Sequence, residues 1–111
     1  MTEQNQLPLN ADDNLSEGES QVFRLRLFVI GASPNSIRAI TNLKTICDQY
    51  IEHNYELEII DVYQQPLIAE AEQIVALPLL IKKSPGIERK LIGDMSNTAK
   101  VLKGLGIYSE S

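Results

Sequence analysis

The sequence contains little sulfur and no long hydrophobic run. Cys47 is the only cysteine, so no disulfide can form within the chain, and a reducing compartment is expected. The N-terminus combines neither positive charge nor an apolar stretch, and no apolar run approaches the length that crosses a membrane. We therefore expect a cytoplasmic protein that does not associate with membranes.

Basic residues are absent from residues 1–21, which carry five of the fifteen Asp and Glu. The ten Lys and Arg of the remainder are matched by ten Asp and Glu, so the net charge of −5 lies in this segment. Such a polar segment cannot offset the entropy cost of ordering, although Leu7, Leu9 and Leu15 leave weak docking open. We expect a disordered acidic leader over 1–21, one domain over 22–108 and a short tail over 109–111.

The balanced charge of the remainder argues against a nucleic-acid partner, which would favour a basic patch. Four basic residues do gather around one expected turn, namely Lys82, Lys83, Arg89 and Lys90. They can contact phosphate, but a solvated hairpin tip is the simpler interpretation. We expect no nucleic-acid partner.

Apolar periodicity predicts alternating strands and helices in the first half of the chain. A strand is expected over Val22 to Ile30, and a helix from Ser36 to about Glu52, with Ser33 as N-cap and Pro34 at the first position. The apolar residues of this helix recur at steps of three and four: Ile37, Ile40, Leu43, Cys47 and Tyr50.

A second strand and a short helix follow. The strand spans Tyr55 to Val62, with Glu56 and Glu58 on its polar face. The helix opens at Pro66 and has an apolar side formed by Leu67, Ala71, Ile74 and Val75.

The last third of the chain predicts a hairpin and a final helix. Leu79 to Lys83 and Ile87 to Ile92 are expected to pair through a type II turn at Ser84-Pro85-Gly86-Ile87. Pro78 stands at the strand entrance, where a cis bond is an option. Asp94 or Ser96 can cap a last helix that bears Met95, Val101, Leu102 and Leu105.

The order β-α-β-α-β-β-α, with a proline before the third strand, predicts a single-domain α/β thioredoxin-like fold. Its first βα loop, "GASPNS", places Ser33 and Ser36 where such proteins carry Cys-x-x-Cys. Serine supplies no thiolate, so disulfide exchange is excluded.

No other catalytic group or cofactor site can be assembled from the sequence. Cys47 fits a buried structural thiol, and His53 fits a surface loop. Asp61 is interpreted as a capping carboxylate rather than a catalytic one. The remaining enzymatic alternatives are a peroxidase acting through Cys47 and a glutathione-dependent transferase acting through Ser33.

Three long segments of the chain are distinctive: "LRLFVIGASPNSIRAI", "LEIIDVYQQPLIAEAEQIVALPLL" and "RKLIGDMSNTAKVLKGLGI". Together they resemble the KaiB family, small clock proteins of cyanobacteria with relatives in other bacteria. The resemblance implies a non-enzymatic protein without a cofactor, which binds the hexameric ATPase KaiC and forms a homo-oligomer, a dimer or tetramer, in a clock or stress-response pathway. The partner-binding positions that it implies are Arg38, Glu56, Glu58, Gln65 and Gln73.

The resemblance also implies two folds, the thioredoxin-like one and a ground state in which the C-terminal half re-pairs. Pro78, Gly104 and Gly106 are the positions implied in this switch; at Gly106 the family commonly has aspartate. Glu58 stands where clock members tend to carry lysine toward the regulator KaiA, so KaiA contact is not expected here.

Two alternatives remain open, one for the function of the chain and one for its second strand. The chain can be a static module similar to the input domain of the kinase SasA, and its second strand is either a partner-binding edge or an acidic edge that resists aggregation.

Overall fold

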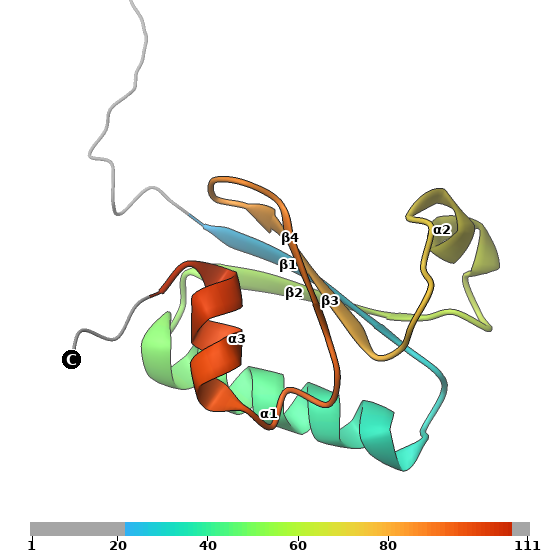
Figure 1. The fold of residues 1–111 in the computed structure, drawn as a ribbon, viewed down its shortest axis with the longest axis horizontal. Coiled ribbons are helices and arrows are strands. Elements are labelled where there is room, and N and C mark those ends of the chain that lie inside the picture. The colour runs from blue at the N-terminus through green and yellow to red at the C-terminus, as the bar shows by residue number, and fades with distance from the viewer. Residues whose placement is uncertain (1–21, 108–111) are drawn as a thin grey trace, which may run out of the picture.

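The computed structural model describes residues 22–107, in which four strands form one mixed sheet between two layers of helices (Figure 1). The elements follow the expected order, so the thioredoxin-like arrangement is confirmed. They are β1 Phe23–Val29, α1 Pro34–Tyr50, β2 Tyr55–Asp61, α2 Pro66–Ala71, β3 Leu79–Ser84, β4 Arg89–Ile92 and α3 Thr98–Leu105. The predicted leader and the predicted tail lie outside the described residues. Within residues 22–107, no helix has the length and apolarity needed to cross a bilayer.

The sheet order is β2-β1-β3-β4. β1 pairs parallel with β2, from Phe23 opposite Tyr55 to Val29 opposite Asp61. β3 runs antiparallel to both β1 and β4, with Leu80 opposite Leu27 on one side and Leu91 on the other. β2 and β4 are therefore the two edges of the sheet.

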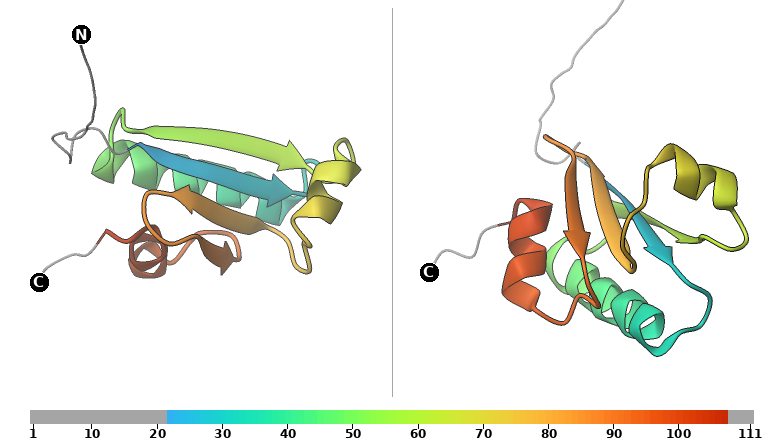
Figure 2. Two further views of the ribbon diagram at one scale, coloured as in Figure 1. Left: turned by 90° about the horizontal axis from the view of Figure 1, so that it is seen from above. Right: turned by 45° about the vertical axis from the view of Figure 1, so that its right-hand side comes forward.

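The helices divide the core into two parts (Figure 2). α1 and α3 cover one face, where the larger cluster includes Leu25, Leu27 and Leu80. The opposite face carries a smaller cluster of Phe28, Ile60, Leu79 and Ile81, against which Ile68 and Ile74 pack from α2 and the segment after it. Since α2 reaches only one end of this face, the other end stays open.

The start of α1 follows the sequence prediction, and its buried side follows it in part. Ser33 caps the helix by accepting from the Ser36 N–H, and Pro34 holds the first position. Of the predicted apolar residues, Leu43 and Cys47 are buried and Ile40 packs against the core, whereas Ile37 and Tyr50 are about half exposed. The buried side is completed by Ser36, Ala39 and Ile46.

Three further predictions are corrected by the structure. Asn97 caps α3, because its side chain accepts from the Lys100 N–H. Neither Asp94 nor Ser96 is therefore the cap. Met95 lies before the helix and not within it. β4 begins at Arg89 rather than Ile87 because its pairing starts opposite Lys82, which leaves a wider loop than a type II turn. α2 ends at Ala71, so Ile74 and Val75 fall beyond it.

Candidate protein-binding surface

The loop that holds the redox motif in thioredoxins serves here to start α1. Ser36 is buried, and its Oγ accepts from the Ile30 N–H at 3.1 Å and from the Ser33 hydroxyl at 2.9 Å. Pro78, after a cis bond to Leu77, lines the same shallow hollow as Ser33 and Ser36. The two loops are therefore side by side as expected, and their polar atoms are engaged in capping.

Cys47 is fully buried between α1 and the sheet. Burial raises its pKa to about 12, with a smaller contribution from the negative charge of Asp48. A thiol with this pKa is almost entirely protonated at neutral pH, and it has no path to a substrate. The geometry therefore gives no support to a peroxidase acting through Cys47.

Two other residues considered in the sequence analysis, Asp61 and His53, do not form a catalytic site. Asp61 accepts from the Tyr63 N–H at 2.9 Å through Oδ1, so its carboxylate stabilises the turn after β2. It does not cap a helix as predicted, because the N-cap positions of α1 and α2 are held by Ser33 and Gln65. His53 is exposed in the loop that follows α1. Within residues 22–107, no group of His, Cys, Asp and Glu side chains has the arrangement of a metal site.

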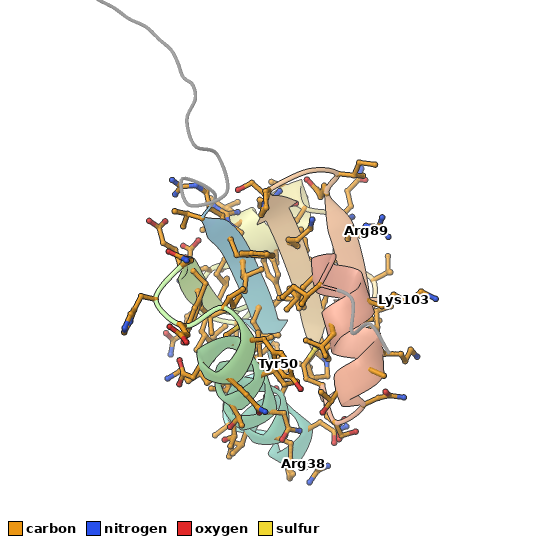
Figure 3. The ribbon with its side chains drawn as sticks, turned by 90° about the vertical axis from the view of Figure 1, so that its left-hand side faces the viewer. Arg38, Tyr50, Arg89 and Lys103 are labelled. Atoms are coloured by element: carbon orange, nitrogen blue, oxygen red, sulfur yellow. The ribbon has the colours of Figure 1, made fainter. Side chains whose placement is uncertain are left out.

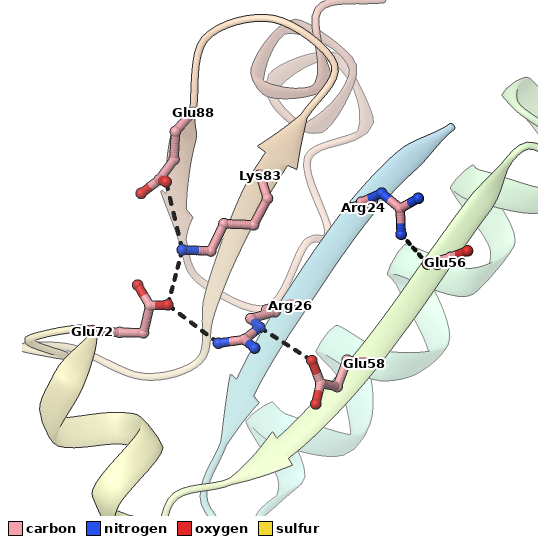
Figure 4. Close-up of polar contacts among 7 residues, drawn as sticks. All are labelled: Arg24, Arg26, Glu56, Glu58, Glu72, Lys83 and Glu88. Atoms are coloured by element: carbon pink, nitrogen blue, oxygen red, sulfur yellow. Dashed lines mark hydrogen bonds and ion pairs between the residues drawn. The ribbon is translucent and has the colours of Figure 1, made fainter. Parts of the chain in front are cut away.

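The open end of the sheet carries a network of ion pairs (Figure 4). Arg24 pairs with Glu56 at 2.6 Å, and Arg26 pairs with Glu58 at 3.1 Å and with Glu72 at 3.2 Å. Lys83 of β3 closes the network, 2.8 Å from Glu72 and 3.5 Å from Glu88. All of these side chains except Glu88 line a groove of about 650 Å³, which we call the charged groove.

Glu72 is the best-shielded carboxylate of the charged groove. The hydrogen bond from Lys83 is the main cause of the lowered pKa of Glu72, and the same bond raises the pKa of Lys83. Since both shifts favour the charged forms, the pair stays ionised at neutral pH. The groove is therefore charged but internally neutralised.

Apolar side chains project to solvent around α2. Tyr63, Leu67 and Val75 are 77%, 78% and 90% exposed, and no residue of α2 is buried. Gln65 stands at the N-terminus of α2 without a side-chain cap, and Gln73 follows the helix with a positive φ of 57°. We call these five residues the α2 surface. Strongly exposed apolar side chains on and beside one short helix are typical of a contact site for another protein.

The structure brings together only some of the residues implied in partner binding. Glu56 and Glu58 line the charged groove, whereas Gln65 and Gln73 flank α2. Arg38 is apart from both: it lies on α1, on the other side of the sheet, where its Nε donates to Asp94 Oδ2 at 3.4 Å (Figure 3). Asn42 also donates to the Asp94 carbonyl oxygen, at 3.0 Å, so α1 holds the loop before α3.

Sequence reasoning missed the exposure of Leu67 and Val75, which it placed on the apolar side of a helix. Six helical residues are too few to bury a continuous apolar side, so only Ile68 packs inward from α2. The brevity of the apolar pattern between Pro66 and Pro78 is the one signal that could have shown this.

The described residues thus form a thioredoxin-like protein whose redox loop lacks sulfur and whose open surfaces suit contacts with other proteins. A family profile described as the KaiB domain matches residues 26–107, and this chain belongs to the KaiB domain family. The circadian clock protein KaiB3 of Synechocystis sp. is 49% identical over 78% of this chain and 84% of its own. The circadian clock oscillator protein KaiB of Gloeothece citriformis is 45% identical over 81% of this chain and 86% of its own.

Solved structures agree on the fold. The N-terminal domain of SasA from Synechococcus elongatus has a TM-score of 0.67 at 26% identity, covering 91% of this chain and 94% of that one. Mitochondrial thioredoxin 3 of Saccharomyces cerevisiae has a TM-score of 0.62 at 20% identity, over 76% of each chain. Family membership confirms the resemblance seen in the sequence. It also confirms the prediction that the chain is not an enzyme, because KaiB proteins are a non-enzymatic family.

Proposed function

We propose that this protein is a non-enzymatic clock or stress-response adaptor that docks on a KaiC-type ATPase through the α2 surface. Its membership of the KaiB family, together with the exposure of Tyr63, Leu67 and Val75, supports the proposal. Three exposed apolar side chains around one short helix provide the area that a partner can desolvate, and Gln65 and Gln73 add a polar rim.

The direct test is size-exclusion chromatography of the full chain with a KaiC homologue from the same organism, with and without ATP. We expect a complex that elutes ahead of the ATPase alone. Absence of any complex after long incubation contradicts the proposal. Leu67→Asp and Val75→Asp should weaken the complex at least tenfold, since each places a carboxylate in the proposed contact.

Ile37→Asp is the matched control for these variants. Ile37 is 51% exposed on α1, across the sheet from α2, so the control adds the same charge at a similarly accessible apolar position. If Ile37→Asp weakens the complex as much as Leu67→Asp, the α2 surface is not the contact. Far-ultraviolet circular dichroism checks that each variant keeps its fold.

Two further parts of the proposal concern assembly and the other partners. We infer a homo-oligomeric ground state and a switch that involves Pro78, Gly104 and Gly106, as the family resemblance implies. Glu58 places a carboxylate on β2 in place of a lysine, and this carboxylate is paired with Arg26. The proposal therefore includes no contact with KaiA. Analytical ultracentrifugation over a range of concentrations tests the oligomer.

A static sensor module is the second candidate, and the TM-score of 0.67 to the SasA domain favours it. The two candidates differ in the number of folded states. Two-dimensional NMR of the native chain and of Gly104→Ala distinguishes them. One unchanged set of peaks in both supports a static module, and two sets with altered populations support a switch.

A further inference from the structure

Some basic residues of the described domain have carboxylate partners, and others do not. Arg24, Arg26 and Lys83 each have a carboxylate partner in the charged groove. Arg89 and Lys90 on β4, and Lys103 on α3, are exposed, and none of them has a carboxylate within ion-pair distance among residues 22–107. We call these last three residues the β4 cations.

The β4 cations surround an edge of the sheet. β4 is the last strand in the sheet order, so its outer backbone groups have no partner strand within the described residues. Arg89 and Lys90 point to opposite faces because neighbouring strand residues alternate. Figure 3 shows Arg89 and Lys103 projecting outward on the same side of the molecule. Ile87, just before the strand, is 73% exposed.

Lys82 does not belong to this surface, which corrects its placement in a solvated hairpin tip. It is only 5% exposed, and its Nζ donates to the Pro85 carbonyl oxygen at 2.5 Å. Burial lowers its pKa, with a smaller contribution from the positive charge of Arg89. The accessible cations of the hairpin are therefore Arg89 and Lys90, together with the already paired Lys83.

The N-terminal segment of the same chain has the opposite composition. Residues 1–21 carry five carboxylates and no basic residue. Four of them stand close together in "ADDNLSEGE", where Leu15 separates Asp12 and Asp13 from Glu17 and Glu19. An acidic stretch with one central leucine complements three unpaired cations beside an exposed isoleucine.

The described domain begins next to the hairpin. Leu25 of β1 pairs with Lys82 of β3, which pairs with Arg89 of β4, so these three residues form a row across the sheet. Two strand spacings put Arg89 about 10 Å from Leu25. Phe23, where β1 begins, lies two strand residues, or about 7 Å, from Leu25 and therefore about 12 Å from Arg89. Glu19 precedes Phe23 by four residues. Four extended residues span about 13 Å, so Glu19 and the carboxylates before it can reach the β4 cations.

We propose that the acidic segment 12–19 binds in cis along the β4 edge, with its carboxylates on Arg89, Lys90 and Lys103 and Leu15 against Ile87. A short tether holds such a segment at millimolar effective concentration, so weak individual contacts suffice for occupancy. This segment then covers the one sheet edge that carries unpaired cations in the described domain. The inference does not depend on the proposed ATPase contact, which lies at α2.

Paramagnetic broadening in the full chain tests the proposal. A nitroxide is attached at Ser16→Cys; the native Cys47 does not compete, because it is buried and its pKa is raised to about 12. We expect amide signals of the β4 cations to lose intensity about twofold or more relative to α1, given the effective concentration. In about 1 M NaCl, where the Debye length is about 3 Å, this preference should disappear.

Charge variants separate the proposal from its alternatives. Replacing all four carboxylates, as Asp12→Asn, Asp13→Asn, Glu17→Gln and Glu19→Gln, leaves the folded domain untouched and should abolish the preference. Combined Arg89→Glu, Lys90→Glu and Lys103→Glu should also abolish it. Lys44→Glu should not, since Lys44 is an exposed cation on α1.

Three outcomes overturn the proposal. Uniform broadening, or broadening centred on β2 or α2, means that the β4 cations are merely solvated. Equal broadening after neutralisation of the four carboxylates means that charge does not hold the segment. Broadening in a mixture of spin-labelled chain and separate isotope-labelled chain, at the level seen within one chain, means that the contact forms in trans.

Discussion

Gly104 and Gly106 lie two residues apart, yet alanine should change stability in opposite directions at the two positions. Gly106 is the C-terminal cap of α3 and has a φ of 82°, in the left-handed region. Its N–H donates to Lys103 O at 3.0 Å, and the Ile107 N–H donates to Leu102 O at 2.8 Å. These are the two bonds of a Schellman cap, which requires the positive φ that glycine adopts without strain.

Gly104 lies inside α3 with ordinary helical backbone. A Cβ built there would lie 3.5 Å from Leu91 Cδ2 of β4, which is normal van der Waals contact. Glycine in a helix costs about 0.5–1 kcal/mol relative to alanine, so Gly104→Ala should stabilise the thioredoxin-like fold by about that amount. The new methyl group would also pack between α3 and β4.

Gly106→Ala should destabilise the same fold. The left-handed conformation costs an L-residue about 1–2 kcal/mol, offset by about 0.4–1 kcal/mol from the reduced entropy of the unfolded chain. The net loss is about 1 kcal/mol. Gly106→Asn should fall between glycine and alanine, because asparagine tolerates this region better.

Thermal unfolding followed by circular dichroism at one protein concentration measures these effects. A change of 1 kcal/mol moves the midpoint by about 4–8 °C in a domain of this size. We expect Gly104→Ala to raise Tm and Gly106→Ala to lower it. Shifts of the same sign for both variants would refute the assignment of Gly106 as a left-handed cap and of Gly104 as a helix-interior residue.

Three further predictions concern buried or paired groups. Because the pKa of Cys47 is raised to about 12 in the folded state, the thiol of the unfolded chain loses its proton at lower pH. The free energy of unfolding should therefore fall by up to about 1.4 kcal/mol per pH unit above pH 9. Urea titrations between pH 9 and 10 should show this slope for the native chain and not for Cys47→Ala. Ser36→Ala removes the acceptor of the Ile30 N–H and should cost about 1–3 kcal/mol by chemical denaturation, more than an exposed Ser96→Ala. The pKa of Glu72 is lowered in the folded state, so this carboxylate contributes stability above its unfolded pKa of about 4.3, and the contribution is lost as pH falls. Glu72→Gln should therefore flatten the decrease of Tm between pH 5 and 3. An unchanged dependence of Tm on pH would contradict the pairing with Lys83.

The elements that sequence predicted best are those whose local pattern agrees with their packing. β1 and β3 are buried on both faces over much of their length, and continuous apolar runs mark them clearly. The N-cap of α1 was predictable because Ser33-Pro34 combines two independent start signals. At the start of α3, three candidate caps, Asp94, Ser96 and Asn97, lie within four residues, so composition could not select Asn97.

The candidate surfaces were less predictable because they depend on pairing between distant segments. The sequence shows Arg24-x-Arg26 and Glu56-x-Glu58 as two separate alternations. Only the parallel register, with Arg24 opposite Glu56 and Arg26 opposite Glu58, turns them into ion pairs. Lys82 was predicted as exposed because lysine is rarely buried, but the hairpin loop folds its Pro85 carbonyl over the ammonium group.

Hydrogen exchange of the full chain, free and bound to a KaiC-type ATPase, tests the central claim most directly. The account predicts slower amide exchange over residues 63–75 in the complex. Exchange at β3 and β4 should keep the pattern of the antiparallel pairing between Leu79–Lys82 and Arg89–Ile92. Protection confined to β2 or to α1, with residues 63–75 unchanged, would contradict the α2 surface as the docking site.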